Sequence, residues 1–123
     1  MSNNQKTILV VDDTPSNIDV VKSILSETYL VQAAVNGKIA LKIAEKKKPD
    51  LILLDIMMPD MDGYEVCKAL KANPDTAGIP VIFVTGKDQK SEENEGLELG
   101  AIGYIMKPVD PSELKIKVAG ILS

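Results

Sequence analysis

Five short runs of apolar, strand-forming residues recur along this 123-residue chain. The intervals between their starts are 22 to 30 residues long, which leaves room for one helix and two short loops in each. Alternating strands and helices favour right-handed βαβ units and a parallel sheet. Continuous apolar runs are typical of strands that helices cover on both faces. The runs begin near Thr7, Tyr29, Leu51, Val81 and Gly103.

Helix signals fill the intervals and follow the last run. We expect Thr14 to cap a first helix that begins at Pro15, and Asp62 to cap a third helix over residues 63–72. The second is predicted over residues 37–46, the fourth over 91–99 and the fifth from Pro111. The fourth is weakly apolar and rich in glutamate, which is typical of a solvated face or of a partner surface. The predicted buried stripes contain Ile18, Val21, Ile24 or Leu25, Ala40, Leu41, Ala44, Val66, Cys67, Leu70, Leu114, Val118 and Ile121.

Length and composition restrict the class of protein. We expect a disordered tail over residues 1–6 and one domain over residues 7–123. The net charge of −4 gives no general attraction to nucleic acid or anionic lipid, and we find neither a membrane-length apolar stretch nor a signal peptide pattern. Cys67 is the only cysteine, which favours the cytoplasm. The chain has no histidine, which rules out histidine-based acid–base catalysis and disfavours a zinc site.

Four of the apolar runs lead directly into polar residues. Parallel strands bring their carboxyl ends to one edge of the sheet, and open α/β sheets bind their ligands at that edge. We therefore expect three carboxylates, a hydroxyl and an ammonium group to meet there. These groups belong to Asp12, Asp13, Asp55, Thr85 and Lys107.

The three carboxylates predict a site for a hard cation. Two unit charges about 4 Å apart repel by about 4 kcal/mol at an effective dielectric constant of about 20, so the carboxylates need a cation or a raised pKa. An all-oxygen set without histidine or cysteine favours Mg²⁺, which commonly partners phosphate. Lys107 and Thr85 suit a phosphoryl group, and a carboxylate such as Asp55 can attack phosphorus. The residues therefore predict Mg²⁺-assisted phosphoryl chemistry.

From Thr7 to the last helix, the chain resembles the receiver domain of two-component response regulators, including the chemotaxis receivers. The resemblance implies a flavodoxin-like, doubly wound α/β fold with a five-stranded parallel sheet of order 2-1-3-4-5 and five helices. The stretches that carry it are Ile8-Leu9-Val10-Val11-Asp12-Asp13, Leu53-Leu54-Asp55-Ile56-Met57-Met58-Pro59, Asp62-Gly63, Val84-Thr85-Gly86 and Gly100-Ala101-Ile102-Gly103-Tyr104-Ile105-Met106-Lys107-Pro108.

The resemblance also implies a role for each site residue. It makes Asp55 the phosphoryl acceptor and places Mg²⁺ on Asp12, Asp13, Asp55 and the backbone carbonyl of Met57. Thr85 and Lys107 are implied to bind the phosphoryl oxygens. Thr85 and Tyr104 are implied to form the switch, and the peptide bond between Lys107 and Pro108 is expected to be cis.

The function implied is that of a phosphorylation-activated signalling switch. A sensor histidine kinase or a histidine phosphotransfer protein would supply the phosphoryl group, and the domain's own chemistry would be limited to self-phosphotransfer and slow self-dephosphorylation. An effector domain following residue 123 and a phosphorylation-dependent dimer are compatible with this function, whereas direct nucleic acid or membrane binding is not expected. One alternative is a non-phosphorylated docking or dimerisation module, which would have a defective pocket. Another is a small phosphatase, which would need a second acid where the chain has Met57.

Overall fold

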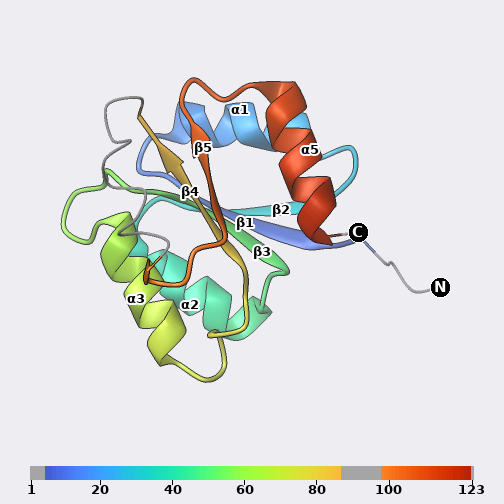
Figure 1. Ribbon diagram of the computed structural model, residues 1–123. Coiled ribbons are helices and arrows are strands. Elements are labelled where there is room, and N and C mark those ends of the chain that lie inside the picture. Colours follow the sequence, from blue (N-terminus) through green and yellow to red (C-terminus); the bar gives the residue numbers. More distant parts are fainter. Residues whose placement is uncertain (1–4, 87–97, 123) are drawn as a thin grey trace.

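The central sheet of the protein is fully parallel and is covered by helices on both faces. The computed structural model describes residues 5–86 and 98–122 (Figure 1). Its strands lie in the order β2-β1-β3-β4-β5, which confirms the predicted flavodoxin-like topology. They are β1 (Thr7–Val11), β2 (Leu30–Ala34), β3 (Leu51–Asp55), β4 (Val81–Thr85) and β5 (Gly103–Met106).

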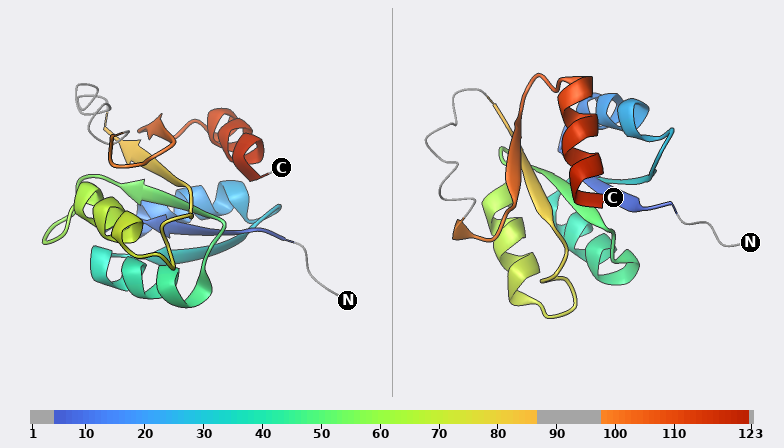
Figure 2. Two further views of the ribbon diagram at one scale, coloured as in Figure 1. Left: turned by 60° about the horizontal axis from the view of Figure 1, so that its bottom comes forward. Right: turned by 45° about the vertical axis from the view of Figure 1, so that its right-hand side comes forward.

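Within the described residues, four helices form the outer layers. Helices α1 and α5 lie on one face of the sheet, and α2 and α3 lie on the other (Figure 2). The helix predicted over residues 91–99 lies almost entirely outside the described residues. None of the described helices has the length and apolar character needed to cross a membrane. Their bounds are α1 (Pro15–Leu25), α2 (Gly37–Lys47), α3 (Gly63–Ala72) and α5 (Pro111–Leu122).

Two apolar clusters hold the helices to the sheet, because successive side chains of a strand point to opposite faces. Leu9 and Phe83 belong to the cluster under α2 and α3, whereas Ile8 and Ile105 belong to the cluster under α1 and α5. The predicted helical stripes all contribute to these clusters. On α1, Leu25 is fully buried and Ile24 only partly, which resolves the alternative at that turn.

Helix α1 begins at Pro15 as predicted, but the hydrogen bonds at its start differ from the prediction. Thr14 occupies the capping position, but its side chain makes no capping hydrogen bond. Instead, its backbone N–H donates to Asp12 Oδ1 at 2.9 Å. The Asn17 N–H, which a capping Thr14 hydroxyl would accept, donates to the Thr14 backbone carbonyl at 3.0 Å. Residue Asp12 therefore supports the beginning of this helix.

The start of α3 follows the prediction. Asp62 Oδ1 accepts the backbone N–H of Glu65 at 2.9 Å, and the Glu65 side chain accepts the N–H of Asp62 at 3.0 Å. This reciprocal capping box fixes the first turn of the helix. The next residue, Gly63, is buried against β3: a Cβ atom there would lie 2.4 Å from the backbone oxygen of Asp55. The absence of a side chain therefore allows α3 to begin directly against the end of β3.

Candidate functional site

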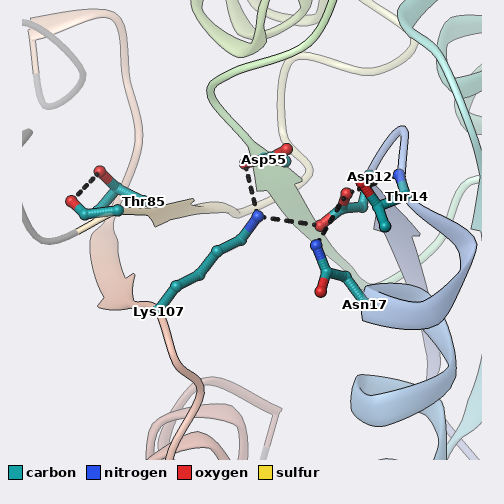
Figure 3. A network of polar contacts seen from close by, with 7 residues as sticks. Asp12, Thr14, Asn17, Asp55, Thr85 and Lys107 are labelled. Atoms are coloured by element: carbon teal, nitrogen blue, oxygen red, sulfur yellow. Dashed lines mark hydrogen bonds and ion pairs between the residues drawn. The ribbon is translucent and has the colours of Figure 1, made fainter.

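The carboxyl ends of the strands bring the predicted polar residues to one edge of the sheet. Asp55 ends β3, Thr85 ends β4, and Asp12 and Lys107 directly follow β1 and β5. The registers place Val11 beside Leu54 and Thr85 beside Met106, so these strand ends are level with one another. Figure 3 shows Asp12, Asp55 and Lys107 converging from three different strands.

Three carboxylates cluster at this edge. Asp12, Asp13 and Asp55 each offer an oxygen, and these oxygens lie within 4.8 Å of one another. Asp12 and Asp55 are only 5% and 4% exposed, whereas Asp13 faces solvent. The cluster therefore has a buried floor and an open side.

Lys107 supplies the positive charge in this cluster. Its ammonium nitrogen lies 3.2 Å from Asp12 Oδ2 and 3.2 Å from Asp55 Oδ1 (Figure 3). The side chain of Lys107 is 29% exposed, so the two ion pairs are largely shielded from water. The peptide bond between Lys107 and Pro108 is cis, as predicted.

The surroundings change the protonation equilibria of this pair. Burial raises the pKa of Asp55, and the Asp12 charge raises it further, while Lys107 offsets only part of the rise. Burial alone would lower the pKa of Lys107, but Asp55 and Asp12 together raise it above its ordinary value. The site therefore favours the charged form of Lys107 and disfavours the charged form of Asp55.

Asp12 is held by residues at the beginning of α1. Its Oδ1 accepts the Thr14 backbone N–H and lies 3.5 Å from Asn17 Nδ2. Sequence reasoning did not predict the contact with Asn17. The sequence does place a polar residue in the first turn of the helix that starts beside the carboxylates. Because helical side chains point toward the N-terminus, such a residue can reach back to Asp12.

Thr85 ends β4, and Tyr104 lies within the neighbouring strand β5. The buried Thr85 hydroxyl donates to the Gly86 carbonyl at 3.1 Å. The half-buried Tyr104 ring packs on Phe83 with centroids 5.7 Å apart, and Phe83 contacts Tyr64 edge-on at 5.2 Å. These aromatic contacts connect β5 through β4 to the start of α3.

Met57 lies on the loop between β3 and α3. Its side chain is 67% exposed, and it lines an open pocket together with Pro59, Asp62 and Tyr64. A thioether is a poor ligand for Mg²⁺, so only the backbone carbonyl of this residue suits the predicted metal role.

The donor set fits a hard cation. All three clustered side chains are carboxylates, and the chain contains no histidine. The position of Lys107 between two of them shows that a positive charge is stabilised at this point. An oxygen cluster with one exposed member is compatible with Mg²⁺ that keeps part of its water shell.

Comparison with known sequences identifies relatives of the whole domain. Residues 8–119 match the model of the family described as "Response regulator receiver domain". A Vibrio cholerae protein named "Probable cyclic di-GMP phosphodiesterase" is 50% identical over 115 residues, covering 94% of this chain and 26% of that protein. Response regulator PleD of Caulobacter vibrioides is 43% identical over 115 residues, covering 93% and 25%. The chain therefore spans about a quarter of the length of these relatives.

Solved structures show the same fold. A CheY-like response regulator receiver domain protein from Methanospirillum hungatei superposes with a TM-score of 0.88 at 36% identity, covering 97% of this chain and 94% of that one. The receiver domain of sensor histidine kinase PA1611 from Pseudomonas aeruginosa gives a TM-score of 0.87 at 28% identity, covering 96% and 98%. The latter structure has a magnesium ion coordinated in its active site cleft.

Proposed function

The chain belongs to the response regulator receiver domain family, and we propose that Asp55 accepts a phosphoryl group from the phosphohistidine of a partner protein. Membership of the family implies phosphorylation-dependent signalling. The observation that best supports our assignment is the ammonium group of Lys107, 3.2 Å from both Asp12 and Asp55 at the carboxyl edge of the sheet. The buried Asp55 carboxylate provides the nucleophile, and the Lys107 ammonium group beside it provides the charge stabilisation that phosphoryl transfer requires.

The transfer step uses groups already present at the edge. A carboxylate oxygen of Asp55 attacks phosphorus in line with the phosphorus–nitrogen bond of the donor histidine. That bond breaks, its electron pair returns to the imidazole, and an aspartyl phosphate remains on Asp55. Lys107 then changes from pairing with the Asp55 carboxylate to binding a phosphoryl oxygen, and the Thr85 hydroxyl donates to another.

Mg²⁺, when bound, neutralises negative charge on the carboxylates and on the phosphoryl oxygens. We assign its binding to Asp12, Asp13, Asp55 and the backbone carbonyl of Met57. The clustering of three carboxylate oxygens within 4.8 Å supports the first three ligands. The magnesium ion in the Pseudomonas aeruginosa receiver domain supports the choice of metal.

The output change involves the ends of β4 and β5. We propose that Thr85 moves toward the phosphoryl group and that Tyr104 then turns inward, which changes the face formed by β5 and its neighbours. One to three charge-assisted hydrogen bonds of about 1.5–3 kcal/mol each are available. A shift from 1:99 to 99:1 needs about 5.5 kcal/mol, so these bonds can drive a nearly complete switch.

The partners proposed are a sensor histidine kinase or a histidine phosphotransfer protein as donor and an effector domain or protein as target, in the cytoplasm. The domain itself would turn over only its own phosphoryl group. We assign residues 7–123 to the domain and residues 1–6 to a tail. A docking module without phosphorylation would not need the complete set of Asp12, Asp13, Asp55, Thr85 and Lys107 that the sheet edge brings together.

Acetyl phosphate tests the proposed acceptor directly. With Mg²⁺ it should add one phosphoryl group, which peptide mass spectrometry should locate on Asp55. Removing Mg²⁺ with a chelator, or changing Asp55→Asn, should abolish the modification. The matched control is Asp60→Asn, an exposed aspartate on the following loop, which should still be phosphorylated. Modification at another residue, or labelling that does not depend on Mg²⁺, would contradict the assignment.

A further inference from the structure

Asn17 is a half-buried amide in the first turn of α1, directly beside the carboxylate cluster. Its backbone N–H donates to the Thr14 carbonyl at 3.0 Å, which fixes the residue in that turn. Its side chain extends back toward the start of the helix, where Nδ2 lies 3.5 Å from Asp12 Oδ1 (Figure 3). An ionised carboxylate only accepts hydrogen bonds, so the amide must present its N–H to Asp12.

The two oxygens of Asp12 have different partners. Oδ1 faces α1, where the Thr14 backbone N–H and the Asn17 amide both approach it. Oδ2 faces the sheet edge, where it pairs with Lys107 at 3.2 Å. Because a carboxylate is planar, donors that fix one oxygen also fix the direction of the other. We propose that Asn17 is a positioning residue that holds Asp12 so that Oδ2 stays directed toward Asp55 and the bound cation.

The residue type fits this role. A lysine at position 17 would place a second ammonium group beside Asp12 and compete with a metal ion for the carboxylate. An aspartate would add a fourth negative charge and could not donate to Oδ1. A neutral amide donates a hydrogen bond and leaves the net charge of the cluster unchanged.

The surroundings of Asn17 strengthen the contact. Asn17, Asp12 and Lys107 line a cavity of about 190 Å³ between α1 and the segment after β5. The other walls of this cavity are apolar and include Val20, Val21 and Pro108. In such an environment water competes less for the carboxylate, so a single neutral donor has a larger effect than it would on an open surface.

This inference rests on the proposed Mg²⁺ role of Asp12, and its test measures metal binding without phosphorylation. The apparent dissociation constant of Mg²⁺ is obtained from the rise in melting temperature with Mg²⁺ concentration and checked by titration calorimetry. Hydrogen-bond partners of metal ligands typically contribute about 10–100-fold to metal affinity. Because Thr14 also holds Oδ1, we expect Asn17→Leu to weaken Mg²⁺ binding by about tenfold, near the lower end of that range.

Four further proteins complete the experiment. Wild type should be stabilised by Mg²⁺, and Asp13→Ala should lose most of that gain. Ser16→Ala, an exposed neighbour in the same turn, should bind Mg²⁺ like wild type. Asn17→Gln keeps the amide and should bind Mg²⁺ more tightly than Asn17→Leu.

The outcomes distinguish a failure of the proposed function from a failure of the role assigned to Asn17. A wild-type protein without any Mg²⁺ response would contradict the proposed function itself. If wild type and Asp13→Ala behave as expected but Asn17→Leu keeps wild-type Mg²⁺ affinity, the role of Asn17 is wrong. A lower melting temperature of Asn17→Leu without Mg²⁺, combined with unchanged affinity, would assign Asn17 to helix stability alone and would also overturn the inference. Equal weakening in Asn17→Leu and Asn17→Gln would show that the amide is not responsible.

Discussion

In the metal-free protein, the surroundings of Asp55 oppose the ionised state that the proposed reaction needs. In the proposed reaction it must be ionised to attack phosphorus. It is buried beside Asp12, however, and burial and the Asp12 charge both raise its pKa. Lys107 reduces the conflict by lying 3.2 Å from each carboxylate. The proposed reaction uses the same ammonium group later to bind a phosphoryl oxygen. A metal ion that neutralised the carboxylates would release Lys107 for that purpose.

Replacing Asp55 by asparagine should stabilise the metal-free fold. A raised folded-state pKa means that the neutral form of Asp55 is favoured by folding and that the ionised form is disfavoured. At neutral pH, Asp55→Asn should therefore melt at a higher temperature than wild type, and a gain of about 1 kcal/mol would correspond to about 4 °C.

The difference in melting temperature between Asp55→Asn and wild type should depend on pH. The difference between the two proteins should shrink as pH falls through the raised pKa of Asp55, because wild type then also carries a neutral side chain. Circular dichroism melts with a chelator present measure it, and Asp60→Asn serves as the exposed control. A lower melting temperature for Asp55→Asn at neutral pH would mean that the ion pair with Lys107 outweighs the cost of burial.

Met57 should prolong the phosphorylated state. Its exposed thioether side chain follows Asp55 by two residues, where it can crowd the approach of water but cannot orient it. Met57→Asn adds an amide that can hold a water molecule, so we expect severalfold faster phosphate release under saturating Mg²⁺. The comparison variant Lys87→Ala, which lies outside the described residues, should change release less. An equal or longer lifetime in Met57→Asn would contradict this explanation.

At the scale of elements, the contact between β3 and α3 positions Asp55, the proposed phosphoryl acceptor. The strand ends at Asp55, and the helix begins eight residues later at Gly63, whose missing side chain allows backbone contact with Asp55 and Ile56. The capping box of Asp62 and Glu65 fixes the same turn. The loop that carries Met57 is therefore held at both ends by closely packed backbone.

Gly63→Ala should disturb both stability and phosphorylation. The added Cβ would lie 2.4 Å from the Asp55 oxygen and 2.8 Å from Ile56 Cα, so either the helix or the strand end must move. We expect a loss of about 1–3 kcal/mol in the free energy of unfolding and slower labelling by acetyl phosphate.

Gly120→Ala is the matched control for this substitution. Gly120 is exposed on α5, and a Cβ atom there would have no neighbour within 4 Å. Alanine is favoured over glycine in a helix by about 0.5–1 kcal/mol, so this variant should gain stability and keep wild-type labelling. If Gly63→Ala were as stable as wild type and labelled at the same rate, the close contact would not be what positions Asp55.

Elements with a strong local signal could be predicted from the sequence. The apolar runs predict the strands, and Asp62 directly before Gly63 predicts the start of α3. The position of the start of α1 could be predicted, but its hydrogen bonds could not. A local pattern gives the Thr14 side chain a capping role, whereas in the structure the Thr14 N–H donates to Asp12, which β1 brings there. The contact of Asn17 with Asp12 has the same origin: it depends on how α1 leaves the sheet edge, which the spacing of residues does not specify.

At the scale of the whole molecule, the two edge strands of the sheet, β5 and β2, differ in their relation to the carboxylate cluster. Strands β4 and β5 end in Thr85 and lead into Lys107, and the Lys107 backbone N–H donates to the Thr85 carbonyl at 2.7 Å. The opposite edge strand, β2, contributes no side chain to the carboxylate cluster in the described residues. If Asp55 is phosphorylated as proposed, we expect the resulting change to reach β4 and β5, which lie next to β3 in the sheet, and the start of α5, which follows β5.

Hydrogen exchange should reveal this asymmetry. After phosphorylation with acetyl phosphate and Mg²⁺, amides at the ends of β4 and β5 and in the first turn of α5 should change their exchange rates, because Thr85 and Lys107 take new partners. Amides of α2 and of β2 before Ala34 should change least, since β2 meets the site at its last residue, where the Ala34 carbonyl accepts the Asp12 N–H at 3.1 Å. Asp55→Asn treated in the same way corrects for effects of Mg²⁺ and acetyl phosphate alone. Changes of equal size in β2 and β5 would indicate that the whole domain responds as one unit, and unchanged rates in β4 and β5 would contradict the switch assigned to Thr85 and Tyr104.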